Sequence, residues 1–130
     1  MPSRSLVGLW LPVLAWAAVI FLLSSRPAND HPEAGLLAQK GAHIAEYAIL
    51  AVLLLRAWLG QGVTPARALL LAWFGAFLYG ASDELHQHFV PTRQPSLVDV
   101  GIDAVGAAGG LALVATWRSL VRLRKQNLPE

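Results

Sequence analysis

Four long apolar segments, joined by shorter polar ones, make up most of this chain. They cover residues 6–23, 41–59, 66–88 and 97–117. Each segment is close to the length of about 20 residues that a helix needs to cross a bilayer. The pattern predicts an all-α integral membrane protein in which residues 1–130 form one domain, a bundle of four transmembrane helices.

The composition supports lipid as the outer solvent of this bundle. Of the 130 residues, 55% are hydrophobic and only 14% are charged, whereas soluble domains carry about 25% charged residues. No basic stripe interleaved with aromatic residues is present, so we expect no nucleic-acid partner. The absence of cysteine excludes disulfides and thiolate metal sites.

The charged residues are divided unequally between the two sides of the predicted bundle. The side that holds both termini and the middle connection has seven basic residues: Arg4, Arg56, Arg67, Arg118, Arg122, Arg124 and Lys125. The other side has three: Arg26, Lys40 and Arg93. Because basic residues favour the cytoplasmic side, both termini are predicted to be cytoplasmic. Seven of the eight acidic residues lie toward the opposite, extracytoplasmic side: Asp30, Glu33, Glu46, Asp83, Glu84, Asp99 and Asp103.

Polar side chains are gathered at the predicted extracytoplasmic ends of three segments. In the second segment, Lys40, His43 and Tyr47 follow an i, i+3, i+7 spacing that places them on one helical face. Glu46 lies three residues after His43 and can reach it. The polar part of this face is therefore predicted to lie near the outer surface of the membrane.

The third segment repeats this arrangement near its end. Asp83, His86 and Gln87 are spaced i, i+3, i+4, and Glu84 lies beside them. Ionisable groups near the bilayer centre cost roughly 2.5–3.5 kcal/mol each on insertion scales. We therefore expect these side chains to face one another, or a water-filled pocket that opens to the outside.

The fourth segment opens on two acidic residues and continues with glycines. Asp99, Asp103, Gly106 and Gly110 fall on one stripe of a helix. Glycines at such a spacing allow a neighbouring helix to approach closely, as the small-xxx-small pattern does in membranes. The same stripe therefore predicts a close helix contact and an acidic contribution to the polar cluster.

Arg93 lies in a connection that two prolines, Pro91 and Pro95, restrict to few conformations. Its guanidinium can bind a carboxylate or a phosphate through two parallel hydrogen bonds. This predicts either an anion ligand in the pocket or an internal salt bridge. The acids available for such a bridge are Asp83, Glu84 and Asp99.

Two short spacings resemble those of helix-borne metal ligands. His43-x-x-Glu46 and Asp83-x-x-His86 each place two ligands on one helical turn. Together with Asp99 or Asp103 they could hold a divalent cation. The alternative is a hydrogen-bonded polar network. We expect no cofactor, with a divalent metal at these residues as the competing interpretation.

The residues of the polar cluster also form a pattern that resembles the VanZ-like membrane proteins. The motifs are K-x-x-H-x-x-x-Y at 40–47, Y-G-x-x-D-E-x-x-Q at 79–87 and F-x-P-x-R-x-x-S-x-x-D at 89–99. The resemblance extends over residues 14–115. Its signature positions are Lys40, His43, Tyr47, Asp83, Glu84, Gln87, Arg93, Ser96 and Asp99. The chain departs from the pattern at Gln39, where the family often has Asp, and at Asp103, where it often has Asn.

The resemblance implies a multi-pass protein of the bacterial plasma membrane that is associated with the cell envelope. The family is named after a protein of a glycopeptide-resistance cluster that raises tolerance to teicoplanin. It implies no agreed reaction or set of catalytic residues. The polar cluster is accordingly expected on the extracytoplasmic side, with membrane lipid as a partner and an oligomer as a further option.

Three functions are compatible with these residues. The leading hypothesis is non-catalytic recognition of a lipid head group, a lipid-linked cell-wall precursor or a glycopeptide. The candidate ligand-binding residues are Lys40, His43, Tyr47, Asp83, Glu84, Gln87, Arg93, Asp99 and Asp103. The second hypothesis is an intramembrane enzyme acting on a lipid-linked substrate, with or without a metal. Its candidate catalytic residues are His43, Glu46, Asp83, Glu84 and His86. The third is a proton or ion pathway along Glu46 and Asp103 in an oligomer.

Overall fold

The computed structural model describes residues 5–27 and 35–126, and it is helical throughout these ranges apart from short connections. The four helices are α1 (Leu6–Ser24), α2 (Leu36–Gly60), α3 (Pro65–Gln87) and α4 (Leu97–Gln126). The all-α prediction is therefore confirmed. The charges predicted at Arg4, Asp30 and Glu33, and Glu130, lie outside the described residues.

Local sequence explains where the helices begin and end. The hydroxyl oxygen of Ser5 accepts a hydrogen bond from the backbone N–H of Gly8 and so caps α1. Pro65 occupies the first turn of α3, where a missing N–H costs nothing. These two helices match the predicted segments within one residue at each end.

The other two helices are longer than the apolar segments predicted them to be. α2 begins at Leu36 rather than at residue 41, and α4 continues to Gln126 rather than ending at residue 117. The added residues are mostly polar but include good helix formers such as Gln, Lys, Arg and Leu. Hydropathy marks the part of a helix that lies in lipid, and the helix itself continues into the more polar surroundings.

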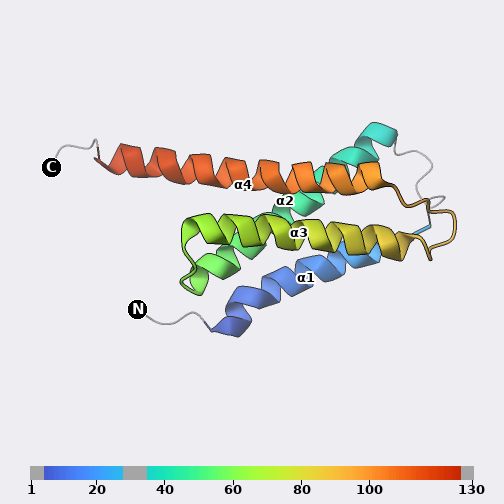
Figure 1. Cartoon of the computed structure of the whole chain (residues 1–130), viewed down its shortest axis with the longest axis horizontal. Helices are drawn as coiled ribbons and strands as arrows, with labels where there is room; N and C mark the ends of the chain where they lie inside the picture. Colours follow the sequence, from blue (N-terminus) through green and yellow to red (C-terminus); the bar gives the residue numbers. More distant parts are fainter. Residues whose placement is uncertain (1–4, 28–34, 127–130) are drawn as a thin grey trace.

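The helices run alternately up and down, and α2 contacts each of the other three (Figure 1). The contacts of α1 are mainly with α2, few with α3, and none with α4 among the described residues. The connection from α3 to α4 lies at one end of the molecule together with the last turn of α1 and the first turn of α2, which we call the polar end. The opposite end, which holds the α2–α3 connection and the last turns of α4, is called the basic end.

The contact between α2 and α4 is close enough that it requires glycine. A Cβ atom on Gly106 would lie 2.7 Å from the carbonyl oxygen of Ile44, and one on Gly110 would lie 2.8 Å from that of Ala48. Both distances are shorter than real Cβ contacts, so the two backbones touch where a side chain would otherwise stand. The close approach that the glycine stripe predicted is confirmed.

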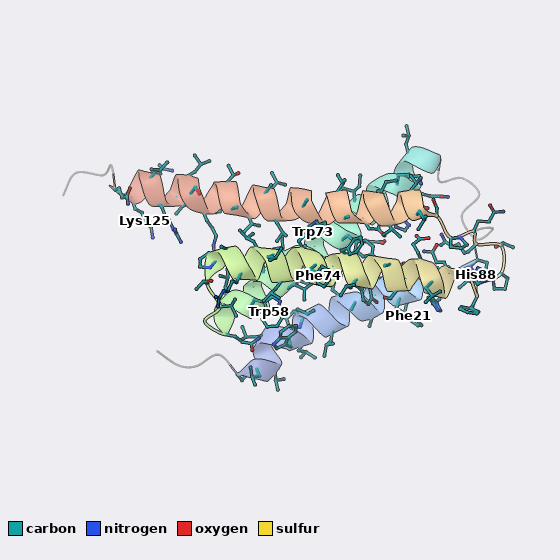
Figure 2. The ribbon with its side chains drawn as sticks, in the orientation of Figure 1. Phe21, Trp58, Trp73, Phe74, His88 and Lys125 are labelled. Atoms are coloured by element: carbon teal, nitrogen blue, oxygen red, sulfur yellow. The ribbon has the colours of Figure 1, made fainter. Side chains whose placement is uncertain are left out.

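Three of the described helices are long and apolar enough to cross a membrane: α1, α4 and the Leu37–Gly60 part of α2. α3 is less apolar because it carries Arg67 near its start and Asp83 and Glu84 near its end. Large apolar side chains project outward along the helices, with Phe74 of α3 as a labelled example (Figure 2). Leu14 is 64% exposed and Leu113 is 75% exposed. Such exposure along whole helices is typical of a lipid-facing surface rather than of a soluble domain.

Gly110→Ala is expected to destabilise the protein by about 1–3 kcal/mol, because the added methyl group forces the backbones of α2 and α4 apart. Gly109→Ala, on the same helix, provides a matched control, since no neighbouring helix comes within 4 Å of a Cβ atom at that position. That substitution should be neutral or stabilising by about 0.5–1 kcal/mol. Denaturation of the purified proteins in mixed micelles, followed by circular dichroism, measures both. Equal losses of stability in the two variants would show that the close contact is unimportant.

Candidate functional site

Three helices meet at the side chain of Asp103, which is only 1% exposed. Its Oδ1 atom lies 3.1 Å from Nδ1 of His43, and this pair joins α4 to α2. Gly80 brings α3 to the same point, because a Cβ there would lie 3.3 Å from Oδ2 of Asp103 and 3.2 Å from the ring of Tyr47. Tyr47 is completely buried beside it. The predicted meeting of polar groups from three helices therefore has a defined centre.

Several polar atoms in this region are buried without a hydrogen-bond partner among the described residues. They are the hydroxyl of Tyr47, Oδ2 of Asp103 and Oε1 of Glu84. An unsatisfied buried group costs about 1–3 kcal/mol. Such groups are rare in folded proteins, and each one requires an explanation. The site thus retains hydrogen-bonding capacity beyond what its own side chains use.

Lys40 and Asp99 form an ion pair that closes the seam between α2 and α4 at the polar end. Both side chains are partly exposed, so water reaches this pair more easily than it reaches the His43–Asp103 pair. Lys40 is one of the predicted ligand-binding residues. In the structure its ammonium group is already neutralised by Asp99, and an external anion would have to compete with that carboxylate.

The polar residues of α3 connect it to α1. Nε2 of Gln87 donates hydrogen bonds to Oγ of Ser24, at 3.0 Å, and to Oδ2 of Asp83, at 3.3 Å. Nε2 of His86 lies 3.0 Å from Oγ of Ser25. The two serines were not among the predicted site residues. The available signal was their position at the polar end of the first apolar segment.

Glu84 fixes the start of α4. Its Oε2 atom accepts a hydrogen bond of 2.8 Å from the backbone N–H of Ser96, the residue that precedes the first turn of that helix. Glu84 is itself only 5% exposed. This contact gives Glu84 a role in positioning the α3–α4 connection. The sequence had predicted only that the two prolines restrict the conformations of that connection.

Arg93 does not form the internal salt bridge that was one of its two predicted arrangements. Nε of Arg93 donates a hydrogen bond of 3.0 Å to the backbone carbonyl of Arg26 in the connection after α1. The ion pairs among the described residues do not include Arg93, so the expected bridge to Asp83, Glu84 or Asp99 is absent there. Its terminal guanidinium nitrogens form no hydrogen bond with the described part of the chain. No carboxylate of residues 5–27 and 35–126 lies within ion-pair distance of the guanidinium group, although Glu46 and Asp83 line the same pocket.

Two neighbouring pockets open at the polar end. The first has a volume of about 230 Å³, and its charged and polar lining residues are Ser24, Arg26, Gln39, His43, Glu46, Asp83, Gln87 and Arg93. The second has a volume of about 290 Å³ and is lined by Gln39, Lys40, His43, Gln87, Thr92, Arg93, Gln94 and Asp99. Gln39, His43, Gln87 and Arg93 border both pockets. Arg93 and His43 therefore lie at the boundary between the two pockets, where one ligand could extend from one pocket into the other.

The predicted metal ligands do not all come together. His43, Glu46 and Asp83 line the first pocket, whereas His86 is bonded to Ser25 and lines neither. No group of three His, Asp or Glu side chains in the described ranges is arranged to hold one metal ion. His43 and Asp103 form a pair of the kind expected in a hydrogen-bonded network.

Comparison with known proteins identifies one family. A family model described as VanZ/LLP1 matches residues 9–118. The matched range contains every candidate residue from Lys40 to Asp103 and most of all four helices. No curated protein and no solved structure matches the chain.

The His43–Asp103 pair is expected to contribute a coupling free energy of about 1 kcal/mol to folding, within the range for interacting side chains. The measurement is a double-mutant cycle with His43→Ala and Asp103→Ala, in which unfolding in mixed micelles is followed by tryptophan fluorescence. His86→Ala combined with Asp103→Ala is the control cycle, because these residues have separate partners. Its effects should add within about 0.5 kcal/mol. Additive effects in the His43 cycle as well would mean that the pair does not stabilise the fold.

Proposed function

Because the chain belongs to the VanZ/LLP1 family, we propose that it is a multi-pass protein of the bacterial plasma membrane that recognises an anionic component of the cell envelope. The ligand would be a phosphate or carboxylate group of a lipid or cell-wall precursor. It would bind in the two pockets of the polar end. Recognition without chemical conversion is the function that these pockets support best.

The observation that carries this proposal is the position of Arg93 between the two pockets. Its guanidinium borders both pockets and has no described carboxylate within ion-pair distance. Arginine is well suited to carboxylate and phosphate because its planar group offers paired N–H donors. Gln87, also shared by the two pockets, provides an amide that helps to orient a bound group.

The charges that line the first pocket indicate which polar groups the rest of the ligand would carry. Arg26 and Arg93 supply cations, while Glu46 and Asp83 supply acids on the same lining. An anion at Arg93 would therefore be followed by hydroxyl or amine groups that donate to the two acids. Each pocket is smaller than about 300 Å³, the lower end of the usual range for small-molecule sites. A head group fits this space, and a whole glycopeptide does not.

The membrane orientation is part of the same proposal. α3 serves as the fourth span, because its polar residues turn toward α1 and α4 instead of toward lipid. The polar end would then face the outside of the cell and the basic end the cytoplasm. This agrees with the preference of Lys and Arg for the cytoplasmic side.

Single cysteines provide a direct test of orientation, since the chain has no cysteine of its own. Gln94→Cys, in the α3–α4 connection, should react with a membrane-impermeant maleimide in intact cells. Gln61→Cys, at the end of α2, should react only after the cells are permeabilised. The reverse labelling pattern would place the pockets in the cytoplasm and remove the proposed access to the envelope.

Arg93→Gln is expected to weaken binding of undecaprenyl phosphate, used here as a lipid-linked phosphate probe, by about tenfold or more. The reason is that a hydrogen bond to a charged group contributes about 1.5–3 kcal/mol. Native mass spectrometry of the detergent-solubilised protein measures the bound fraction. Arg67→Gln removes the same charge from the basic end and is the matched control. If both variants bind the probe as the original protein does, the pocket is not an anion site.

In the cell, the proposed recognition of an envelope component would contribute to glycopeptide tolerance. Expression of the protein in a teicoplanin-susceptible bacterium should raise the tolerated concentration of teicoplanin. Arg93→Gln should abolish the gain at an equal level of protein in the membrane. An unchanged gain in the variant would separate tolerance from the polar pockets.

A further inference from the structure

The basic end carries a cluster of positive charges that has no part in the proposed function of the polar end. All five described acidic residues, Glu46, Asp83, Glu84, Asp99 and Asp103, belong to the polar half of the molecule. Within the described ranges, the last turns of α4 therefore have cations and no nearby carboxylate. These cations are Arg118, Arg122, Arg124 and Lys125.

The length of α4 places these cations at a membrane surface. Its 30 residues correspond to about 45 Å of helix, against about 30 Å for the hydrocarbon core. The end of α4 extends past the α2–α3 connection, with Lys125 on the projecting part (Figures 1 and 2). Trp117, at the end of the apolar segment 97–117, is 69% exposed, and tryptophan is enriched at membrane interfaces.

A pocket of about 150 Å³ lies at the base of the projecting part, between α2, α3 and α4. Its apolar wall includes Leu55, Leu59 and Leu69, and its cationic rim consists of Arg118 and Arg122. These arginines are four residues apart and so share one face of α4. We call this the basic pocket.

The donors in the basic pocket are the guanidinium groups. The hydroxyl of Ser119 already donates a hydrogen bond of 3.0 Å to the carbonyl of Ala115. Pro65, at the first turn of α3, also lines the pocket, and the side chain of Thr64 makes no capping hydrogen bond there. The positive end of the α3 dipole thus adds to the field of the two arginines.

We propose that the basic pocket binds the phosphate of an anionic phospholipid, with Arg118 and Arg122 as its ligands. The acyl chains would lie along the leucine wall and the adjoining apolar surface. A soluble anion would leave that wall and Trp117 without a partner. Clusters of four or more basic residues directly beyond a transmembrane helix are suited to anionic lipid. This site lies at the opposite end from the pockets of the proposed function and does not depend on them.

Native mass spectrometry of the full-length, detergent-purified protein tests the proposal, with phosphatidylglycerol and phosphatidylcholine as probes. The original protein should bind phosphatidylglycerol in preference to phosphatidylcholine. Arg118→Gln combined with Arg122→Gln should weaken phosphatidylglycerol binding by about tenfold or more, since both charged donors to the phosphate are removed from the lining of the pocket. Arg124→Gln combined with Lys125→Gln removes the same charge outside the pocket and should change binding by less than about threefold. Arg93→Gln should have no effect on it.

Three outcomes would overturn the proposal. Equal weakening by the two double variants would show a diffuse charge effect without a pocket. Phosphatidylglycerol is anionic and phosphatidylcholine has no net charge. Equal binding of the two lipids would show that the site does not select an anionic lipid. Displacement of phosphatidylglycerol by millimolar inorganic phosphate would indicate a soluble anion as the ligand. Because all four residues are exposed, circular dichroism should show unchanged helicity in every variant.

Discussion

The close contact between α2 and α4 at Gly106 and Gly110 sets the geometry of the remaining structure. Where two backbones touch, their helices have few alternative registers, because every sliding step brings a larger side chain into the contact. The Lys40–Asp99 and His43–Asp103 pairs lie along the same seam, on the side toward the polar end. The glycines therefore position the Lys40–Asp99 ion pair and the His43–Asp103 hydrogen-bonded pair, which could not form if α2 and α4 were held farther apart.

Burial of polar groups among apolar helices explains why α1 and α3 join this seam. An apolar surrounding strengthens each hydrogen bond and raises the cost of each one that is missing. Gln87 donates a hydrogen bond to Ser24 of α1, and His86 contacts Ser25 directly after that helix. Glu84 accepts a hydrogen bond at the start of α4. Each contact shields polar atoms of α3 from lipid. Three buried polar atoms have no partner among the described residues, and they belong to Tyr47, Glu84 and Asp103, which line neither of the two pockets.

The two ends of the molecule present different chemistry to the membrane surfaces. At the polar end, cations and acids are mixed: the lining of the two pockets holds Arg26, Lys40 and Arg93 together with Glu46, Asp83 and Asp99. At the basic end, the described charges are all positive. Such polarity favours one orientation in the bilayer. It also separates the two pockets proposed to bind an anionic group from the basic pocket proposed to bind an anionic phospholipid.

The amino-acid sequence by itself determined the helical class, the apolar cores of the helices, the glycine stripe and the gathering of Lys40, His43 and Asp103 at one end. These features follow from periodicity within single helices, which needs no knowledge of a partner. Tertiary structure alone decided that Lys40 is neutralised by Asp99, that Arg93 bonds to the carbonyl of Arg26, and that serines of α1 complete the network. Partner choice among several acids and cations depends on the register and crossing of neighbouring helices. That register is fixed by packing between residues that are distant in the sequence. The pattern of residues within one helix does not specify this packing.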